Sequence, residues 1–197
     1  AKLQESPELK AIQELTSIHG FGPKIAKKLF ADHAIANTSE LRAAHANGTI
    51  TLNDTQILGL KYADDIKLKI PFEEVVQHGQ VLKKALQNVD KKANAGNSLR
   101  NVAKLQVCIC GSHRRKKQLS GDIDALLTLE RKKGSPNVRV AAGASFLNSF
   151  VEELKSENYV TETLGLGNTK FMGICKLNQT LTEGSLHGRT RLALKST

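Results

Sequence analysis

The stretch GSHRRKKQLSGDID at residues 111–124 is the most informative part of the sequence and decides its fold. Its end carries Asp122 and Asp124, two positions apart. If residues 122–128 form a strand, these two carboxylates point to the same face, roughly 6 to 7 Å apart along the backbone. At that separation they can share one divalent cation or hold two, because hard cations such as Mg²⁺ take oxygen ligands.

Donors for phosphate oxygens precede the carboxylates within the same stretch. Ser112 and Arg115 can donate from a hydroxyl and a guanidinium, and a guanidinium suits bidentate contact with phosphate. Ser120 and Gly121 can donate from a hydroxyl and a backbone N–H. Each piece alone would ordinarily be a capped strand end, but their joint occurrence at this spacing disfavours that interpretation. The stretch therefore predicts a site for a nucleotide with its metal rather than for a bare ion.

The overall composition is that of a folded protein with an excess of positive charge. The 197 residues can form one large domain or two small ones, and 40% apolar content is ordinary for a folded chain. The formal charge of +10 favours a polyanionic partner, with nucleic acid as the leading candidate, although solvated lysines that bind nothing are the other interpretation. No stretch approaches the roughly 20 apolar residues of a membrane helix, so no membrane partner is expected.

The cysteines and the first residues bear on the compartment. Cys108, Cys110 and Cys175 show neither a disulfide framework nor a CxxC metal spacing, which indicates free thiols in a reducing compartment. Residues 1–20 have no signal-peptide layout. The chain begins as though cut from a longer one, so a removed targeting segment stays an open alternative.

Residues 1–70 are predicted to form an all-α subdomain of short helices. Their starts are marked by Ser6 with Pro7, by Pro23, by Thr38 or Ser39, and by Asn53. The helix that Asn53 caps is expected to run to about Lys69. This half is too small to hold much core of its own.

Residues 71–197 are predicted to form a mixed α/β unit. A long amphipathic helix starting at Pro71 is expected to pack on a sheet, and residues 90–100 are expected to form a loop. Residues 104–110 are apolar on both faces, which predicts a central strand. The remaining predicted elements are a strand over 121–129, a helix over 144–157, and hairpin strands over roughly 159–164 and 169–177.

A second motif lies between the first two predicted helices. Gly20 and Gly22 flank one apolar residue, and Pro23 then starts a helix that carries Lys24 and Ile25. Glycine permits close backbone approach, and a helix N-terminus offers unpaired N–H groups to an anion, so this loop can hold a DNA phosphate without contacting a base. A plain helix-turn-helix corner is the alternative. It needs a glycine but not the whole GFGPK pattern.

The GFGPK segment resembles the helix-hairpin-helix of DNA repair proteins. In those proteins a monovalent cation, Na⁺ or K⁺, often bridges loop carbonyls to the phosphate. The resemblance implies that the carbonyls here belong to Thr16, Ile18 and Phe21.

The stretch at residues 111–124 resembles the palm motif of the family X DNA polymerases, and within that family the beta type. The match extends from about Leu9 to Leu177, with GLKY at 59–62, KIPFEE at 69–74 and NTKFMGIC at 168–175 as further similar segments. The fold that the resemblance implies is α+β, a small helix-hairpin-helix subdomain over residues 1–70 followed by a mixed α/β nucleotidyltransferase palm over 71–197. The palm is expected to be incomplete at its C-terminus.

The resemblance also implies a reaction and its partners. The reaction is template-directed addition of a deoxynucleotide to a primer 3′-OH in short gaps, as in base excision repair. Asp122 and Asp124 would bind two Mg²⁺ ions, Lys69 would join Ser112, Arg115, Ser120 and Gly121 at the nucleotide, and Lys170 would lie near DNA. The implied partners are gapped or primed double-stranded DNA and a deoxynucleoside triphosphate. A monomer in the nucleus is expected, with the mitochondrion as the alternative compartment.

The sequence departs from the family pattern in three respects. Lys116 stands where the family usually has glycine, which could add a phosphate contact or stiffen the loop. The lyase domain and the thumb of the family are not expected in this chain. Family members also carry a third aspartate shortly after a His-x-Arg, whereas here HGR at 187–189 is followed by Arg191 at the expected position. A cation there would repel a catalytic metal.

The missing carboxylate leaves other functions open. Glu183 is a weak substitute because of its predicted loop position. A non-catalytic relative that binds DNA and nucleotide is therefore the main alternative to a polymerase. A nucleotidyltransferase acting on RNA or small molecules is a third class, which the helix-hairpin-helix argues against.

Overall fold

The computed structural model describes residues 6–94, 103–131, 142–177 and 190–196, and the chain divides into two compact units. We call Ala1–Asp64 the helical unit and Asp65–Thr197 the sheet unit. The boundary lies ahead of the predicted one after residue 70, because Ile70 pairs with Ser120 and is buried in the core of the sheet unit. Among the described residues, no helix has the length and apolar character needed to cross a membrane.

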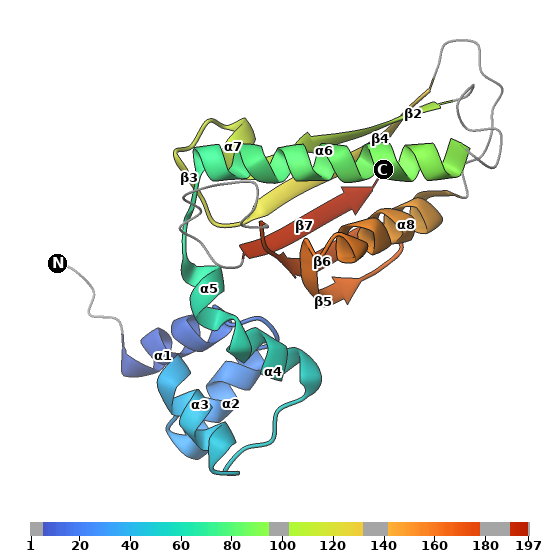
Figure 1. The fold of residues 1–197 in the computed structure, drawn as a ribbon. Helices are drawn as coiled ribbons and strands as arrows, with labels where there is room; N and C mark the ends of the chain where they lie inside the picture. Colours follow the sequence, from blue (N-terminus) through green and yellow to red (C-terminus); the bar gives the residue numbers. More distant parts are fainter. Residues whose placement is uncertain (1–5, 95–102, 132–141, 178–189, 197) are drawn as a thin grey trace. The chain divides into compact units, whose positions relative to one another are not determined.

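The helical unit begins its helices where the sequence places caps (Figure 1). The Ser6 hydroxyl accepts a hydrogen bond from the Leu9 N–H, and Asn53 and Gln56 form a reciprocal capping box. The helices are α1 (Pro7–Thr16), α2 (Pro23–His33), α3 (Thr38–Ala46), α4 (Asp54–Lys61) and α5 (Ala63–Lys67), which reaches across the unit boundary.

The predicted single helix from Asn53 to about Lys69 is wrong, because the chain turns at Tyr62 between α4 and α5. The turn allows Leu60 and Ala63 both to reach the core of the helical unit. That core also buries Leu15, Ile18, Phe21 and Leu41. A small hydrophobic core therefore holds the loop between α1 and α2 in place.

The sheet unit contains a five-stranded sheet in the order β2-β4-β7-β6-β5. Strands β4 and β7 are parallel, and the other neighbouring pairs are antiparallel. The strands are β2 (Ala103–Ile109), β4 (Ile123–Arg131), β5 (Val160–Leu166), β6 (Lys170–Cys175) and β7 (Thr190–Ser196). A separate short pair joins β1 (Ile70–Pro71) to β3 (Leu119–Ser120), and the helices are α6 (Phe72–Asn94), α7 (Gly111–Arg114) and α8 (Ala142–Ser156).

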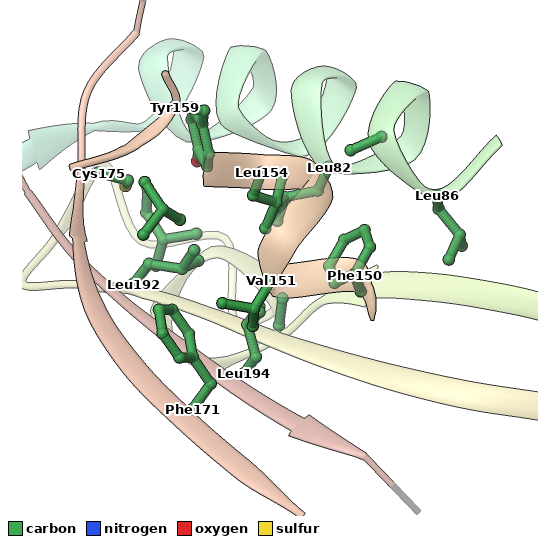
Figure 2. Packing of buried hydrophobic residues seen from close by; sticks show 14 of the residues in the cluster. Leu82, Leu86, Phe150, Val151, Leu154, Tyr159, Phe171, Cys175, Leu192 and Leu194 are labelled. Carbon is green, nitrogen blue, oxygen red and sulfur yellow. The ribbon is translucent and has the colours of Figure 1, made fainter. Parts of the chain in front are cut away.

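Helices α6 and α8 cover the same face of the sheet (Figure 1). Figure 2 shows Leu82 of α6 and Phe150 and Val151 of α8 packed towards Leu192 and Leu194 of β7. Successive strand residues point to opposite faces, so the neighbours of these buried leucines lie on the other side. We call that side the open face. The expected class, a helical subdomain followed by a mixed α/β unit, is confirmed.

Two expectations for the sheet unit are wrong in detail. Helix α6 continues to Asn94 through the residues expected to start a loop, and an ion pair from Lys92 to Glu153 ties its last turns to α8. Strand β2 is an edge strand rather than a central one. Its polar side is formed in part by Cys108, which is exposed although cysteine counts as apolar in a sequence pattern.

Candidate functional site

The two aspartates lie on the open face at the beginning of β4. Asp122 immediately precedes the strand, Asp124 is its second residue, and the intervening Ile123 is fully buried on the covered face. Both aspartates are half-buried. The predicted placement of the two carboxylates on one face is therefore confirmed.

The chain around Gly111 is built against Asp124. The Cys110 N–H donates to the backbone carbonyl of Asp124 at 2.8 Å, which joins the start of α7 to β4. Gly111 has a φ of +55°, a left-handed conformation that glycine adopts without the usual side-chain penalty. A Cβ atom there would lie against the Oδ2 of Asp124, closer than van der Waals contact allows. Only glycine fits this approach without displacing the carboxylate.

Two of the predicted phosphate donors come together at α7. Ser112 lies in the helix and Arg115 directly follows it, and the Arg115 Nη2 donates to the Ser112 hydroxyl over 3.4 Å. Because that bond is long and exposed, it holds the guanidinium weakly and leaves it able to turn to another acceptor. Helix α7 is itself held by the His113 ring, which stacks on Phe72 with centroids 4.4 Å apart.

The turn formed by Ser120 and Gly121 is positioned by the β1–β3 pair. Ser120 is opposite Ile70 in that pair and is 2% exposed, and no described group bonds to its buried hydroxyl. Gly121 is half-buried, so its backbone is the more accessible of the two predicted donors. The exposed Lys69 reaches the same turn, with its Nζ 3.5 Å from where a Cβ of Gly121 would lie. Lys69, Ser120 and Gly121 therefore lie close together, although Ser120 does not present its hydroxyl to solvent.

Arg191 lies beside Asp122 on the open face. In the parallel register of β4 and β7, Ile123 is opposite Leu192, which places the two preceding residues next to each other. The Arg191 Nη2 donates to the Asp122 Oδ2 at 2.7 Å, and the side chains are 33% and 27% exposed. A guanidinium thus occupies the place where the family resemblance predicts a third carboxylate. HGR at 187–189 and Glu183 lie outside the described residues.

The described residues do not fit a pair of Mg²⁺ ions. Of the two carboxylates, that of Asp122 is already engaged by Arg191. Within the described ranges, no three His, Cys, Asp or Glu side chains gather as a metal site would require. Among the described residues, the predicted two-ion site therefore has two carboxylates and the guanidinium of Arg191, with no third carboxylate.

Asp124 differs from Asp122 in having no hydrogen bond or ion pair to its carboxylate among the described residues. Burial is the main cause that raises the pKa of Asp124, and the charge of Asp122 raises it further. Nearby Lys195, Arg191 and Arg115 oppose this shift. Its carboxylate faces a hollow of about 350 Å³ that is also lined by Cys110, Gly111, Arg114, Ala193 and Lys195.

Lys195 and Arg114 were not predicted as site residues, although one signal in the sequence indicates Lys195. In β7, Arg191, Ala193 and Lys195 alternate with the buried Leu192 and Leu194, which is the pattern of a half-covered strand. The predicted DNA contact Lys170 is exposed and is opposite Lys195 in the β6–β7 register. Basic side chains therefore stand on neighbouring strands of the open face.

The loop between α1 and α2 in the helical unit has the geometry of an anion site. Gly20 has a φ of +88°, and Gly22 caps α2 without any side-chain bond to the first helical turn. The following Pro23, Lys24 and Ile25 are exposed. The first N–H groups of α2 are thus open to a phosphate.

The proposed carbonyl ligands of a monovalent cation lie around the same loop. Thr16 is the last residue of α1, and the Ile18 carbonyl accepts the Phe21 N–H at 3.2 Å. The loop packs closely on α4, because a Cβ on Gly59 would clash with the His19 carbonyl oxygen. This close packing was not predicted from the sequence.

Comparisons with known proteins agree with both units. The sequence matches the family described as DNA polymerase beta palm over residues 69–195, and the fingers domain of DNA polymerase lambda over residues 13–67. It is 31% identical over 158 residues to a DNA polymerase lambda of Arabidopsis thaliana, and 25% identical over 177 residues to one of Rattus norvegicus. These alignments cover 80% and 87% of this chain but only 25% and 26% of the relatives. The chain thus spans about a quarter of the length of these curated relatives.

Solved structures with a similar fold include two complexes of one protein. The ternary gap complex of Leishmania infantum polymerase beta superposes with a TM-score of 0.77 at 36% identity, over 100% of this chain and 60% of that one. The ternary P/T complex of the same polymerase gives 0.76 at 36% identity, over 98% and 67%.

Proposed function

The chain belongs to the family X DNA polymerases, and we propose that it holds gapped or primed double-stranded DNA and a deoxynucleoside triphosphate for template-directed addition to a primer 3′-OH. Filling of short gaps in base excision repair is the process we propose. One of the similar polymerase beta structures is a ternary gap complex, which supports gapped DNA as the substrate. We propose that the protein works as a monomer in the nucleus, with the mitochondrion as the alternative.

One observation carries the nucleotide part of this proposal. The carboxylates of Asp122 and Asp124 lie at the same edge of the sheet unit as the donors of α7 and of the Gly121 turn. Ser112, Arg115 and Lys69 would contact phosphate oxygens, and the backbone N–H of Gly121 would add a neutral donor. Members of the family use divalent metal ions, which neutralise phosphate charge when bound. The described residues do not fit a second ion.

The DNA part rests on the helical unit and on one strand. The exposed N-terminus of α2 at Gly22 to Ile25 would hold a backbone phosphate, with Na⁺ or K⁺ at the loop carbonyls of Thr16, Ile18 and Phe21. Lys170 on β6 would add a second phosphate contact on the sheet unit. Such contacts are independent of base sequence, so template pairing would select the incoming nucleotide.

Extension of a labelled primer across a one-nucleotide gap tests the proposal. The complete protein should extend the primer with the nucleotide complementary to the template. Asp122→Ala should abolish extension while DNA binding persists. Full activity of that variant would refute the assignment of the carboxylates.

A second candidate function is favoured by the ion pair between Arg191 and Asp122. It is a relative that binds DNA and nucleotide without turning the nucleotide over. Filter binding of gapped DNA and titration of a deoxynucleotide, beside the extension assay, separate the two functions. Binding without extension in the complete natural protein would support the second one.

A further inference from the structure

We propose that the guanidinium of Arg191 takes the place of one of two divalent ions at the carboxylate site. Arg191 pairs with Asp122, and Asp124 binds a single divalent ion together with the nucleotide. This inference rests on the nucleotide binding proposed above. The ligand it predicts is a nucleoside triphosphate carrying one divalent cation. It also predicts that the primer hydroxyl lacks a metal of its own at this site.

The position of Arg191 is determined by the sheet and not by a loop. Arg191 is opposite Ile174 of β6, and the next residue, Leu192, is opposite Ile123 of β4. Its backbone therefore cannot move away from Asp122 without breaking strand pairing. The Arg191 side chain projects from the open face next to Asp122, and its Nη2 lies 2.7 Å from the Asp122 Oδ2.

The charges at the site favour one ion over two. The ion pair with Asp122 at 2.7 Å places one positive charge against one of the two carboxylates. One divalent ion could still bind the carboxylate of Asp124, because no described side chain forms a hydrogen bond or ion pair with it. A second divalent ion at Asp122 would have to displace Arg191 and remain within a few ångströms of it, where like charges repel. Lys195, on the same face of β7, adds further positive charge near Asp124.

Counting bound Mn²⁺ by electron paramagnetic resonance tests the inference directly. The chain is mixed with gapped DNA that has a dideoxy-terminated primer and with a non-hydrolysable deoxynucleotide, and bound ions are counted per nucleotide. We expect one Mn²⁺ in the wild type. Arg191→Asp should raise the count to two, because it removes the cation and supplies a carboxylate next to Asp122.

Two further variants keep the result interpretable. Arg191→Gln removes the charge without adding a ligand, so it should bind a second Mn²⁺ more tightly than the wild type and less tightly than Arg191→Asp. Lys195→Gln removes a nearby charge that does not contact Asp122, so its count should stay at one. Melting curves establish that each variant is folded.

Activity provides a second readout on a primer with a free 3′-OH. Arg191→Asp should extend it about 100-fold faster than the wild type, the size of effect of a single well-placed group in an active site. Two Mn²⁺ ions per nucleotide in the wild type, or one in both folded Arg191 variants, would overturn the inference. Failure of every variant to bind nucleotide would overturn the proposed function, and the inference with it.

Discussion

Replacement of Gly111 by alanine tests the close contact on which the geometry of the carboxylate site depends. The φ of +55° at this residue is left-handed, which costs an alanine roughly 1–2 kcal/mol. The added Cβ would also press on the Oδ2 of Asp124 and push that side chain off its rotamer, at about 0.5–1.5 kcal/mol. Alanine also reduces the conformational entropy of the unfolded chain relative to glycine, which stabilises the folded state by about 0.4–1 kcal/mol. The net loss in free energy of unfolding should be about 0.5–3 kcal/mol.

Urea unfolding followed by circular dichroism measures this loss, and titration with a fluorescent deoxynucleotide measures the nucleotide affinity of the site. Gly165→Ala is a matched control in the same unit, because a Cβ at Gly165 would have no neighbour within 4 Å. The control should change the unfolding free energy by less than about 0.5 kcal/mol. Gly111→Ala should lose both stability and nucleotide affinity because Asp124 is displaced. Equal unfolding midpoints and equal affinities for the two variants would show that the contact between Gly111 and Asp124 does not shape the site.

Four other residues give further predictions. Lys24→Gln should weaken binding of gapped DNA and reduce the slope of log K against log salt by about one, whereas Lys84→Gln on the exposed side of α6 should change neither. Burial lowers the pKa of His78 below 6.5 despite the neighbouring Glu74, so below about pH 6.5 the unfolded chain takes up a proton that the folded chain resists. The free energy of unfolding should therefore fall as the pH drops through this range, and urea titrations should show a weaker pH dependence for His78→Gln. Tyr159 and Cys175, which also face His78, stay neutral in this range because burial raises the pKa of both groups. Lys116 has a φ of +55°, so Lys116→Gly should raise the unfolding free energy by up to about 1 kcal/mol and Lys116→Ala should not. Burial raises the pKa of the Cys175 thiol to about 12, so a thiol reagent should label the exposed Cys108 first and leave Cys175 unlabelled until unfolding, as mass spectrometry can verify.

Local sequence signals predicted the elements that depend on local chemistry. Ser6 and Asn53 cap helices because their side chains bond to N–H groups three residues ahead. The face shared by Asp122 and Asp124 follows from the alternation of any strand. The break at Tyr62 was missed because it depends on how Leu60 and Ala63 reach a core formed by distant residues.

Other features of the site depend on which strands become neighbours. Residues 122 and 191 are far apart in the sequence, and their ion pair requires the parallel register of β4 and β7. The family resemblance placed Arg191 at the position of a missing carboxylate, but only the structure shows which aspartate it engages. The edge position of β2 has a similar origin, since an apolar pattern does not reveal whether a second neighbour is present.

The positive φ of Lys116 explains why the family pattern has glycine at this position. The resemblance places glycine here, and a left-handed residue is where glycine is favoured. The sequence left open whether the lysine adds a phosphate contact or stiffens the loop. The backbone conformation shows that it occupies a position for which lysine is poorly suited.

Asp122, Asp124 and the donors of residues 111–121 are proposed to act together as one nucleotide site. The decisive measurement is the affinity of the chain on gapped DNA for the complementary deoxynucleoside triphosphate, with Mg²⁺, for the wild type and Asp124→Asn. Glu73→Gln, an exposed carboxylate at the start of α6, is the control. We predict that Asp124→Asn weakens binding by at least about tenfold, as loss of a metal-site partner does, and that the control does not. Equal affinities for all three proteins would contradict the existence of this site.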